Sequence, residues 1–441
     1  MAPGVSAQTT APDVDSAFAP PPKGRPAAFG FIFASAVMSA VSMGLIFPIL
    51  PNLIRSFFGP ANAATTASAA EWQFVFGAAW GAMQFLAGPV LGLLSDRFGR
   101  RPVMLVSILG LAADFLVMSF APSLAWLLVG RVLSGLTGAS FATASAYVAD
   151  ISAADERARN FGWISAGLSV GFLVGPAAGG FLATHAIRFG GFALDPLRTP
   201  FLVAAGLCAA NGAFGLLALP ESLPPERRLK ALDWAQANPV GSMSLLASHR
   251  DLPPLAAINF LCQLATQALP NVFVLYVTLR YNWSLAFLGV TFVIIGLVQI
   301  LVQSFVVAPV VARVGERGAM IAGACAAVAG FVLFGLSTSG WSFFVAMPIF
   351  ELGGLIQPGL QGLMTRRVSG AEQGRLQGAN QSIGGLAAIL GPAVFPLSFA
   401  WALRHLPGLP GLPILIAAGL FVAALAVTLR LGRATGPAAG P

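Results

Sequence analysis

Long apolar runs alternate with short polar intervals along the whole chain, which is the pattern of a protein that crosses a bilayer repeatedly. A transmembrane helix needs about 20 predominantly apolar residues. Twelve runs reach roughly that length. The predicted spans are residues 29–50, 72–94, 102–120, 124–149, 159–183, 199–219, 253–279, 284–312, 318–337, 341–364, 374–401 and 411–430. We therefore predict an all-helical membrane protein with twelve transmembrane helices.

Polar segments divide the predicted spans into two sets of six. Residues 1–28 are rich in Ala and Pro and lack the order of a signal peptide, so we predict a disordered tail. Residues 220–252 are the largest polar interval and are predicted to be a surface linker. The predicted halves are therefore residues 29–219 and 253–430, and residues 431–441 form a second tail.

Basic residues predict the orientation, because cytoplasmic loops of membrane proteins are enriched in Lys and Arg. With both termini in the cytoplasm, 18 Lys and Arg residues are cytoplasmic and only 5 face outward. The outward bases are Arg55, Arg188, Arg198, Arg280 and Arg404. The reverse orientation would invert this ratio, so both tails and the linker are predicted to be cytoplasmic.

Composition excludes several other classes of protein. Hydrophobic residues make up 57% of the 441 residues and charged residues 9%, against about 25% charged in soluble proteins. The net charge of +8 does not indicate nucleic-acid binding, because the bases lie in loops between spans. The three Cys and three His residues are scattered and predict neither a disulfide framework nor a metal site. With no nucleophile–base pair, we expect no enzyme and no cofactor.

The two predicted halves repeat in sequence at a fixed spacing. Adding 216 takes Arg97, Gly99, Arg101 and Met104 to Arg313, Gly315, Arg317 and Met320; it also takes Gly138 to Gly354, Glu156 to Glu372, Gly162 to Gly378, and Gly175-Pro176 to Gly391-Pro392. One spacing that holds across three loops indicates two parallel six-helix halves. This plan is similar to that of the major facilitator transporters.

The loop between spans two and three carries a carboxylate, two glycines and three arginines. The candidate gating residues are Gly92, Asp96, Arg97, Gly99, Arg100 and Arg101. Asp96 can cap the next helix or pair with a base in the other half, and the arginines alone can be a loop that sets topology. The whole string resembles the signature loop of major facilitator proteins, which implies a latch at the inner gate.

Span five carries glycines at spacings that allow helices to approach closely, together with a helix-bending proline. The residues are Gly162, Gly171, Gly175, Pro176, Gly179 and Gly180. An ordinary packing face is the alternative interpretation. The string also resembles the antiporter motif of proton-coupled exporters in this family, and that resemblance implies proton exchange.

Three charged residues lie inside predicted spans, where charge is costly and usually functional: Asp114, Arg131 and Glu351. Neither acid has a base within one turn of its own helix, so we expect each to hold and release a proton without a basic partner. A helix–helix hydrogen bond is the alternative for both acids, and a structural pair is the alternative for Arg131. The family resemblance implies that Arg131 is the span-four arginine associated with proton coupling.

Neutral polar side chains in the spans are candidates for substrate binding: Ser39, Gln84, Gln299, Gln357 and Gln361. Gln84 and Gln299 end matching Gly-x-x-Gln strings, and we expect them to face a central cavity. Hydrogen bonding between helices is the alternative role for such amides.

Over about residues 30 to 430 the chain resembles the tetracycline/proton antiporters and related drug exporters. The strings that carry the resemblance lie at 44–51, 92–104, 111–115, 130–135, 160–163, 353–362 and 377–378. By this resemblance Asp114 matches the family's acid in span three. Tetracycline antiporters carry Asp, His and Asp at or near Ser39, Gln299 and Ala327, and the loss of these groups argues against tetracycline. Glu351 is a candidate to replace part of the missing charge.

Together these features predict a monomeric antiporter that exports an apolar or amphipathic small molecule, tetracycline-like or a multidrug substrate. Its partners would be the substrate, protons and the bilayer, without nucleic acid, and the proton gradient would supply the energy. The scarcity of Lys beside abundant Ala and Gly suggests a GC-rich bacterial genome, hence the inner membrane. A metabolite or lipid exporter of the same fold, or a non-transporting receptor or scaffold, remains as an alternative.

Overall fold

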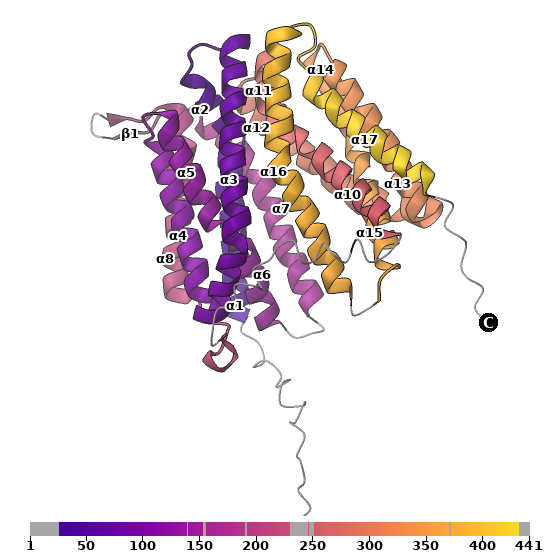
Figure 1. Ribbon diagram of the computed structural model, residues 1–441. Coiled ribbons are helices and arrows are strands. Elements are labelled where there is room, and N and C mark those ends of the chain that lie inside the picture. The colour runs from indigo at the N-terminus through magenta and orange to yellow at the C-terminus, as the bar shows by residue number, and fades with distance from the viewer. Residues whose placement is uncertain are drawn as a thin grey trace, which may run out of the picture.

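The computed structural model describes residues 26–138, 140–152, 156–189, 192–229, 246, 251–369 and 372–431 (Figure 1). The predicted tails lie almost entirely outside these residues, and so does much of the predicted linker. The first helix begins at Pro26, slightly before the predicted start of span one.

The first group of helices precedes the linker. Its members are α1 (Pro26–Ile46), α2 (Leu50–Ser56), α3 (Ala63–Phe98), α4 (Arg100–Ser119), α5 (Leu124–Thr137), α6 (Ser140–Ile151), α7 (Arg157–Leu182) and α8 (Thr199–Ala218). A hairpin of two-residue strands, β1 (Arg188–Phe189) and β2 (Phe192–Ala193), and the 3-10 turn η2 (Pro196–Arg198) connect α7 to α8. The 3-10 turn η3 (Pro225–Arg227) follows α8.

The second group of helices follows the linker. Its members are α10 (Leu252–Thr266), α11 (Ala268–Tyr281), α12 (Leu285–Leu301), the π-helical turn η6 (Val302–Val306), α13 (Val307–Leu336), α14 (Gly340–Glu351), the 3-10 turn η7 (Leu352–Leu355), α15 (Ile356–Thr365), α16 (Gln373–His405) and α17 (Leu412–Arg430). Three of the predicted spans in this group, namely spans seven, eight and ten, are therefore built from two or more helical pieces.

Ten helical stretches of the described residues are long and apolar enough to cross a bilayer, which confirms the predicted helical membrane fold. Two local features account for the difference from twelve. The stretch Leu285–Leu336 contains predicted spans eight and nine, with a non-helical residue, Gly315, between them. Predicted span four is divided between α5 and α6, and α5 alone is too short to be counted.

Two glycines with left-handed backbone make the equivalent turns of the two groups. Gly99 (φ 106°) separates α3 from α4, and Gly315 (φ 72°) interrupts α13. Glycine adopts this backbone without the steric cost that a Cβ imposes. The repeated Arg-x-Gly-x-Arg string therefore places a sharp turn after one long helix in each group.

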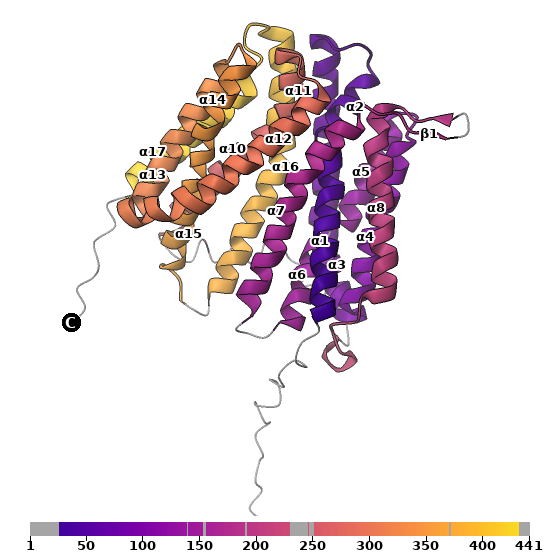
Figure 2. The same ribbon diagram turned by 180° about the vertical axis from the view of Figure 1, so that it is seen from behind.

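The two helix groups meet at one end of the molecule and diverge toward the other, as both ribbon views show (Figures 1 and 2). We call the two ends the Glu71 end and the Asp96 end. α3 packs on α16 and α7 packs on α12 across the boundary between the groups. Near the Glu71 end, Arg404 of α16 forms a two-pronged ion pair with Glu71 of α3, with Nη2 2.9 Å from Oε2.

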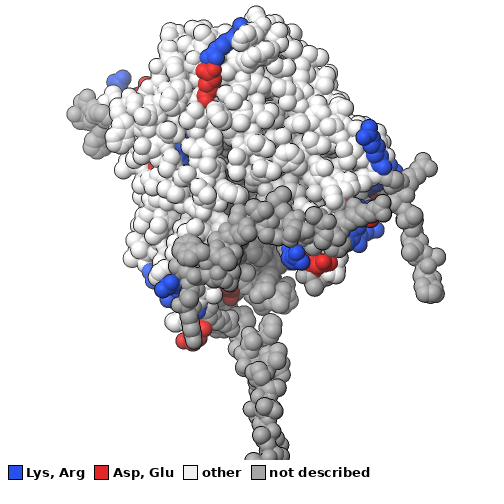
Figure 3. Space-filling model, viewed as in Figure 1, with Lys and Arg blue, Asp and Glu red and all other residues white. Residues whose placement is uncertain are grey.

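Charge is confined largely to the two ends of the molecule. In the space-filling view a broad, nearly uncharged band lies between charged residues at the upper and lower rims (Figure 3). This distribution is what a bilayer requires of a protein surface, because charged side chains in hydrocarbon are costly.

Candidate functional site

Arg100 is the centre of a charge cluster at the Asp96 end. Its Nη1 lies 2.5 Å from Asp96 Oδ1, and its Nε lies 3.2 Å from Asp150 Oδ2 at the end of α6. Nη1 also donates to Ser95 Oγ, whose hydroxyl donates to the carbonyl of Gly92. Of the two roles predicted for Asp96, pairing does occur, but the base lies in the same loop rather than in the other helix group.

The other two arginines of the loop have different partners. The Arg97 guanidinium lies 5.5 Å from the ring centre of Phe98, a cation–π contact. Arg101 Nη2 donates to the carbonyl of Leu216 in α8 at 2.7 Å. The three arginines of the string therefore do three different things, and only Arg100 joins the ion-pair cluster.

Glu221, the second residue after Leu219, closes this cluster from the linker side. Its Oε1 accepts hydrogen bonds from the backbone N–H groups of Arg100 at 2.8 Å and of Ser222 and Leu223 at 3.0 Å. A carboxylate is favourable at the N-terminus of a helix, and α4 begins at Arg100. Sequence reasoning missed this role and assigned Glu221 only to a surface linker. A lone acid just after a span was the available signal.

The equivalent turn in the second group repeats this arrangement with the charges exchanged. Glu316 Oε1 lies 2.9 Å from Arg366 Nη2, which follows α15. Arg317 Nη2 donates to the carbonyl of Leu429 in α17 at 3.1 Å, just as Arg101 bonds a carbonyl of α8. The degenerate second copy of the loop therefore keeps the turn, one ion pair and one arginine–carbonyl bond.

The prediction that Asp114 lacks a basic partner is wrong. Arg131 Nη2 lies 3.1 Å from Asp114 Oδ2, and Asp114 is fully buried. The base comes from the neighbouring helix α5, which the spacing within α4 could not reveal. Gly130 makes room for the carboxylate, since a Cβ there would lie 2.6 Å from Asp114 Oδ1. The same nitrogen of Arg131 also contacts Met118 Sδ at 3.2 Å.

Glu351 lies where span ten changes its helical form. It is the last residue of α14 and is followed by η7 before α15 begins. Among the described residues no ion pair joins Glu351 to a base. Gly353 packs against Ala327, and a Cβ at Gly354 would lie 2.8 Å from Gln303 Nε2. Glu351 thus precedes by two residues the glycine that packs on Ala327, the position near which the resemblance placed a missing acid. It precedes by three residues the glycine that faces the amide of Gln303 in η6.

The glycine face of α7 contacts helices of both groups. A Cβ added at Gly175 would lie 2.7 Å from Gly44 Cα in α1. A Cβ added at Gly180 would lie 3.2 Å from Gly289 Cα in α12 of the second group. Gly162 differs, because a Cβ there would meet open space. Close approach of helices therefore explains why Gly175 and Gly180 are glycines, but it does not explain the glycine at position 162.

Two more glycines extend the contact between α7 and α1. Gly171 and Gly179 lie one turn to either side of Gly175, and a Cβ at either would collide with α1. Pro176 lies inside α7 and removes one backbone hydrogen bond at the same level. Span five therefore approaches α1 closely over more than two helical turns.

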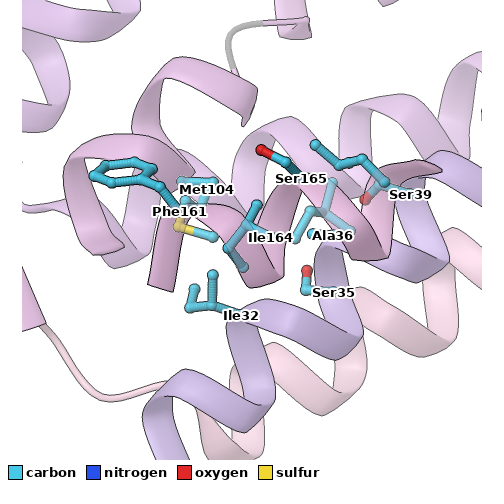
Figure 4. Close-up of a pocket in the computed structure, with 11 residues that line it drawn as sticks. Ile32, Ser35, Ala36, Ser39, Met104, Phe161, Ile164 and Ser165 are labelled. Atoms are coloured by element: carbon cyan, nitrogen blue, oxygen red, sulfur yellow. The ribbon is translucent and has the colours of Figure 1, made fainter. Parts of the chain in front are cut away.

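Ser39 lines a cavity of about 250 Å³ inside the first group, between α1, α4, α6 and α7. The close-up shows its hydroxyl with those of Ser35 and Ser165 among apolar side chains such as Ile32 and Ile164 (Figure 4). None of the residues that line this cavity is ionisable. The structure therefore places Ser39 within one helix group, away from Gln84 and Gln299.

Gln84 and Gln299 line two separate cavities at the boundary between the groups, rather than one. Gln299 lines a cavity of about 620 Å³ between α7, α12, η6 and Phe47, the residue after α1, and we call it the α7–α12 cavity. Gln84 lines a cavity of about 400 Å³ between α3 and α16, here called the α3–α16 cavity. Gln303 of η6 and Gln381 of α16 are further amides in these walls, and the sequence analysis did not single them out.

The remaining two predicted amides belong to a network within the second group. Gln357 Nε2 donates to Asn259 Oδ1 at 3.5 Å, and Asn380 Nδ2 donates to Gln361 Oε1 at 3.4 Å. Asn259 Nδ2 donates to Asn380 Oδ1 at 3.0 Å and so joins the two pairs. These contacts match the alternative role of interhelical hydrogen bonding. Asn259 and Asn380 were missed because single amides in apolar runs carry no motif.

Chemistry beyond ion pairing and hydrogen bonding has little support in the described residues. They contain no group of three or more His, Cys, Asp or Glu side chains placed to share a metal ion. Cys208 and Cys262 are buried thiols, and Cys325 is exposed. The candidate site therefore comprises the ion pairs of Arg100, Glu316 and Asp114, a glycine contact and three uncharged cavities.

Comparison with known proteins agrees with this geometry. A family model described as Major Facilitator Superfamily matches residues 32–392. The class C tetracycline resistance protein of Escherichia coli is 37% identical over 369 residues, covering 84% of this chain and 89% of that protein. The class G tetracycline resistance protein of Vibrio anguillarum is 35% identical over 359 residues, covering 81% and 86%.

A solved structure of low sequence identity has a similar fold. The crystal structure of the human organic anion transporter MFSD10 (TETRAN) matches with a TM-score of 0.64 at 22% identity, covering 91% of this chain and 99% of that chain. The resemblance predicted from short sequence strings is therefore confirmed over most of the chain.

Proposed function

The chain belongs to the Major Facilitator Superfamily, and from this premise we propose that it is a proton-coupled antiporter that exports an amphipathic small molecule. The observation that carries the proposal is the placement of the antiporter glycine string on α7. That helix contacts α1 of its own group and α12 of the other through positions without side chains. Similarity to tetracycline resistance proteins over most of the chain supports export of a drug-like compound.

The excess of bases supports an orientation with the Asp96 end in the cytoplasm of a bacterial cell and the chain in the inner membrane. In that orientation the helix groups touch at the outer end, where Glu71 binds Arg404, and diverge toward the cytoplasm. The structure then corresponds to an inward-open state. Transport would proceed by rocking the groups about the α3–α16 and α7–α12 contacts.

In the outward-open state the signature loop would act as a latch against the second helix group. In the present state Asp96 and Asp150 hold Arg100 within the first group. Closing the cytoplasmic end would bring this cluster toward α13 and α15, where Glu316 and Arg366 form the equivalent pair. Release of Arg100 from Asp96 and Asp150 would give the latch two alternative arrangements.

Glu351 is the first choice for the group that carries the proton. It has no basic partner in the described residues and lies at a change of helical form. Three residues later, Gly354 packs against the amide of Gln303, which lines the α7–α12 cavity. Gain or loss of a proton there can therefore act on a cavity wall. Asp114 is the second choice, with Arg131 tuning it, because release of the Arg131 pair would also require protonation.

The test is efflux from proteoliposomes under an imposed proton gradient, with a compound chosen by a drug-susceptibility panel. We expect efflux driven by the gradient, lost in Glu351→Gln and retained in the linker control Glu226→Gln. Binding of the compound should stay measurable in Glu351→Gln. Efflux that does not respond to the gradient would overturn proton coupling. Wild-type rates in both Glu351→Gln and Asp114→Asn would show that neither acid carries the proton.

A further inference from the structure

The α7–α12 and α3–α16 cavities are built from equivalent positions of the internal repeat. Three pairs in their walls are Gly81 and Gly296, Gln84 and Gln299, and Gly88 and Gln303. The members of each pair are 215 residues apart in the sequence. One wall of each cavity is therefore the same stretch of helix, taken once from span two and once from span eight.

The opposite walls repeat as well. Ser169 and Leu173 of α7 line one cavity, and Gly385 and Ile389 of α16 line the other. These residues are separated by 216 positions, the spacing that relates the loops and glycine strings. Each cavity thus lies between a span-two-like helix and a span-five-like helix. The molecule contains two versions of one cavity, related by its pseudo-twofold axis.

The difference between the two spacings has a structural cause. The spacing is 215 at Gly81 and Gly296 and 216 at Arg97 and Arg313, so the second copy gains one residue between these points. The π-helical turn η6 lies in that interval. A π turn closes its hydrogen bonds over one residue more than an α turn, so it can hold the extra residue locally. The equivalence of the two cavities therefore survives the insertion.

The walls of both cavities are apolar and carry only uncharged polar groups. None of the lining residues is ionisable, and apart from the indole N–H of Trp80 the polar side chains are those of Ser and Gln. Within the described residues the amides of Gln84, Gln299 and Gln303 form no hydrogen bond to protein, so their donors and acceptors are open to a ligand. Volumes of about 620 and 400 Å³ lie in the range of small-molecule sites.

The geometry points to a pair of equivalent sites that bind an uncharged amphipathic compound, whose polar groups bond Gln299 in one site and Gln84 in the other. A charged ligand would lose water in these cavities without gaining a countercharge, which is strongly unfavourable. A neutral ligand with an apolar body loses little and satisfies the free amides. This inference rests on the proposed function, because it takes the two sites as substrate sites of an exporter. Binding can nevertheless be measured without transport.

The experiment measures dye binding to the purified protein in lipid nanodiscs, with empty nanodiscs subtracted. The neutral amphiphile Nile red is compared with the permanent cation rhodamine 6G. We expect two molecules of Nile red per protein and at least tenfold weaker binding of rhodamine 6G. Equal or tighter binding of the cation, or a single Nile red site unaffected by the variants below, would overturn the inference.

Variants assign the sites. Gln84→Leu and Gln299→Leu should each weaken one of the two Nile red sites by about tenfold, and the double variant should weaken both. Gln377→Leu is the matched control, because Gln377 is an exposed amide of α16 that lines neither cavity. Thermal unfolding of each variant checks that the fold is kept.

If a gradient drives export of a cation at rates above those of neutral compounds, the proposed function stands and this inference fails.

Discussion

Arg100 and Glu316 lie at equivalent positions of the internal repeat, 216 residues apart, and carry opposite charges. Their partners, Asp150 and Arg366, are also 216 residues apart and are also exchanged in charge. The nitrogen–oxygen distances are 3.2 Å in the first pair and 2.9 Å in the second. The repeat has thus kept an ion pair at each site while reversing which helix supplies the base.

This reversal predicts that swapping the two charged residues is tolerated better in the Glu316–Arg366 pair than in the Arg100–Asp150 pair. The double variant Glu316→Arg with Arg366→Glu copies the polarity of the first pair and should restore the transport lost in either single variant. Arg366 is 76% exposed, so the pair is worth at most about 1 kcal/mol. The measurement is a double-mutant cycle on transport rate. No recovery in the double variant would contradict equivalence of the pairs.

Swapping the charges of Arg100 and Asp150 should restore less of the lost transport. Arg100 is only 14% exposed and also bonds Asp96 and Ser95. The double variant Arg100→Glu with Asp150→Arg places a carboxylate beside Asp96, which like-charge repulsion disfavours. We expect lower transport and lower melting temperature than in the exchanged second pair. Equal recovery at both sites would show that Asp96 does not hold Arg100.

The glycines of α7 predict a graded response to a single methyl group. Gly175→Ala should reduce transport and lower the melting temperature, because the new Cβ would lie 2.7 Å from Gly44 Cα. Gly162→Ala is the matched control on the same helix, where the Cβ meets open space, and it should leave both unchanged. Fluorescence-detected size exclusion and efflux assays measure the two effects. Equal tolerance at both glycines would remove close packing as the reason for this motif.

Because Asp114 is paired with Arg131, neutralising Asp114 and neutralising Glu351 should affect the folded yield differently. Asp114→Asn leaves the Arg131 guanidinium without its carboxylate, and breaking a buried pair costs about 3–5 kcal/mol. We expect reduced folded yield in Asp114→Asn and recovery in the double variant with Arg131→Gln. Glu351→Gln should give normal yield, since no base pairs with it in the described residues. Folded yield and melting temperature in detergent provide the comparison.

Glu71 and Arg404 are expected to hold the helix groups together at their end of the molecule. Glu71→Gln or Arg404→Gln should raise the population open at that end by up to about fivefold, as expected for an exposed ion pair of about 1 kcal/mol. Exchanging both charges should return the population to its original value. Spin labels at positions 61 and 408, with native cysteines replaced, would report the separation. An unchanged distance distribution in both single variants would argue against this role.

Periodicity and hydropathy were sufficient to predict the fold, because a helix in a bilayer must satisfy its backbone internally and present an apolar surface. The same reasoning placed the loops that contain Gly99 and Gly315 between predicted spans, at residues 95–101 and 313–317. It could not find the partner of Asp114, because Arg131 comes from a neighbouring helix and pairing between helices depends on packing angle. It also missed Glu221, whose hydrogen bonds to the start of α4 depend on the path of the chain after α8.

The candidate substrate residues show the same limit. All five were recognised as polar groups in spans, but their grouping was not predictable. Gln357 and Gln361 bond to Asn259 and Asn380, whereas Gln84 and Gln299 line cavities about the boundary between helix groups. Which neutral side chains meet each other is decided by the rotation of each helix about its axis.

The π turn at Val302–Val306 makes the second copy of the repeat tolerant of a length change inside the membrane. In a regular α-helix one added residue would rotate every later side chain by about 100° around the axis. Arg313 and Gly315 would then point away from the loop positions that Arg97 and Gly99 occupy in the first copy. Because the wider turn absorbs the residue, a duplicated gene could lengthen this helix without losing the downstream motif, a freedom that the uninterrupted helix α3 does not have.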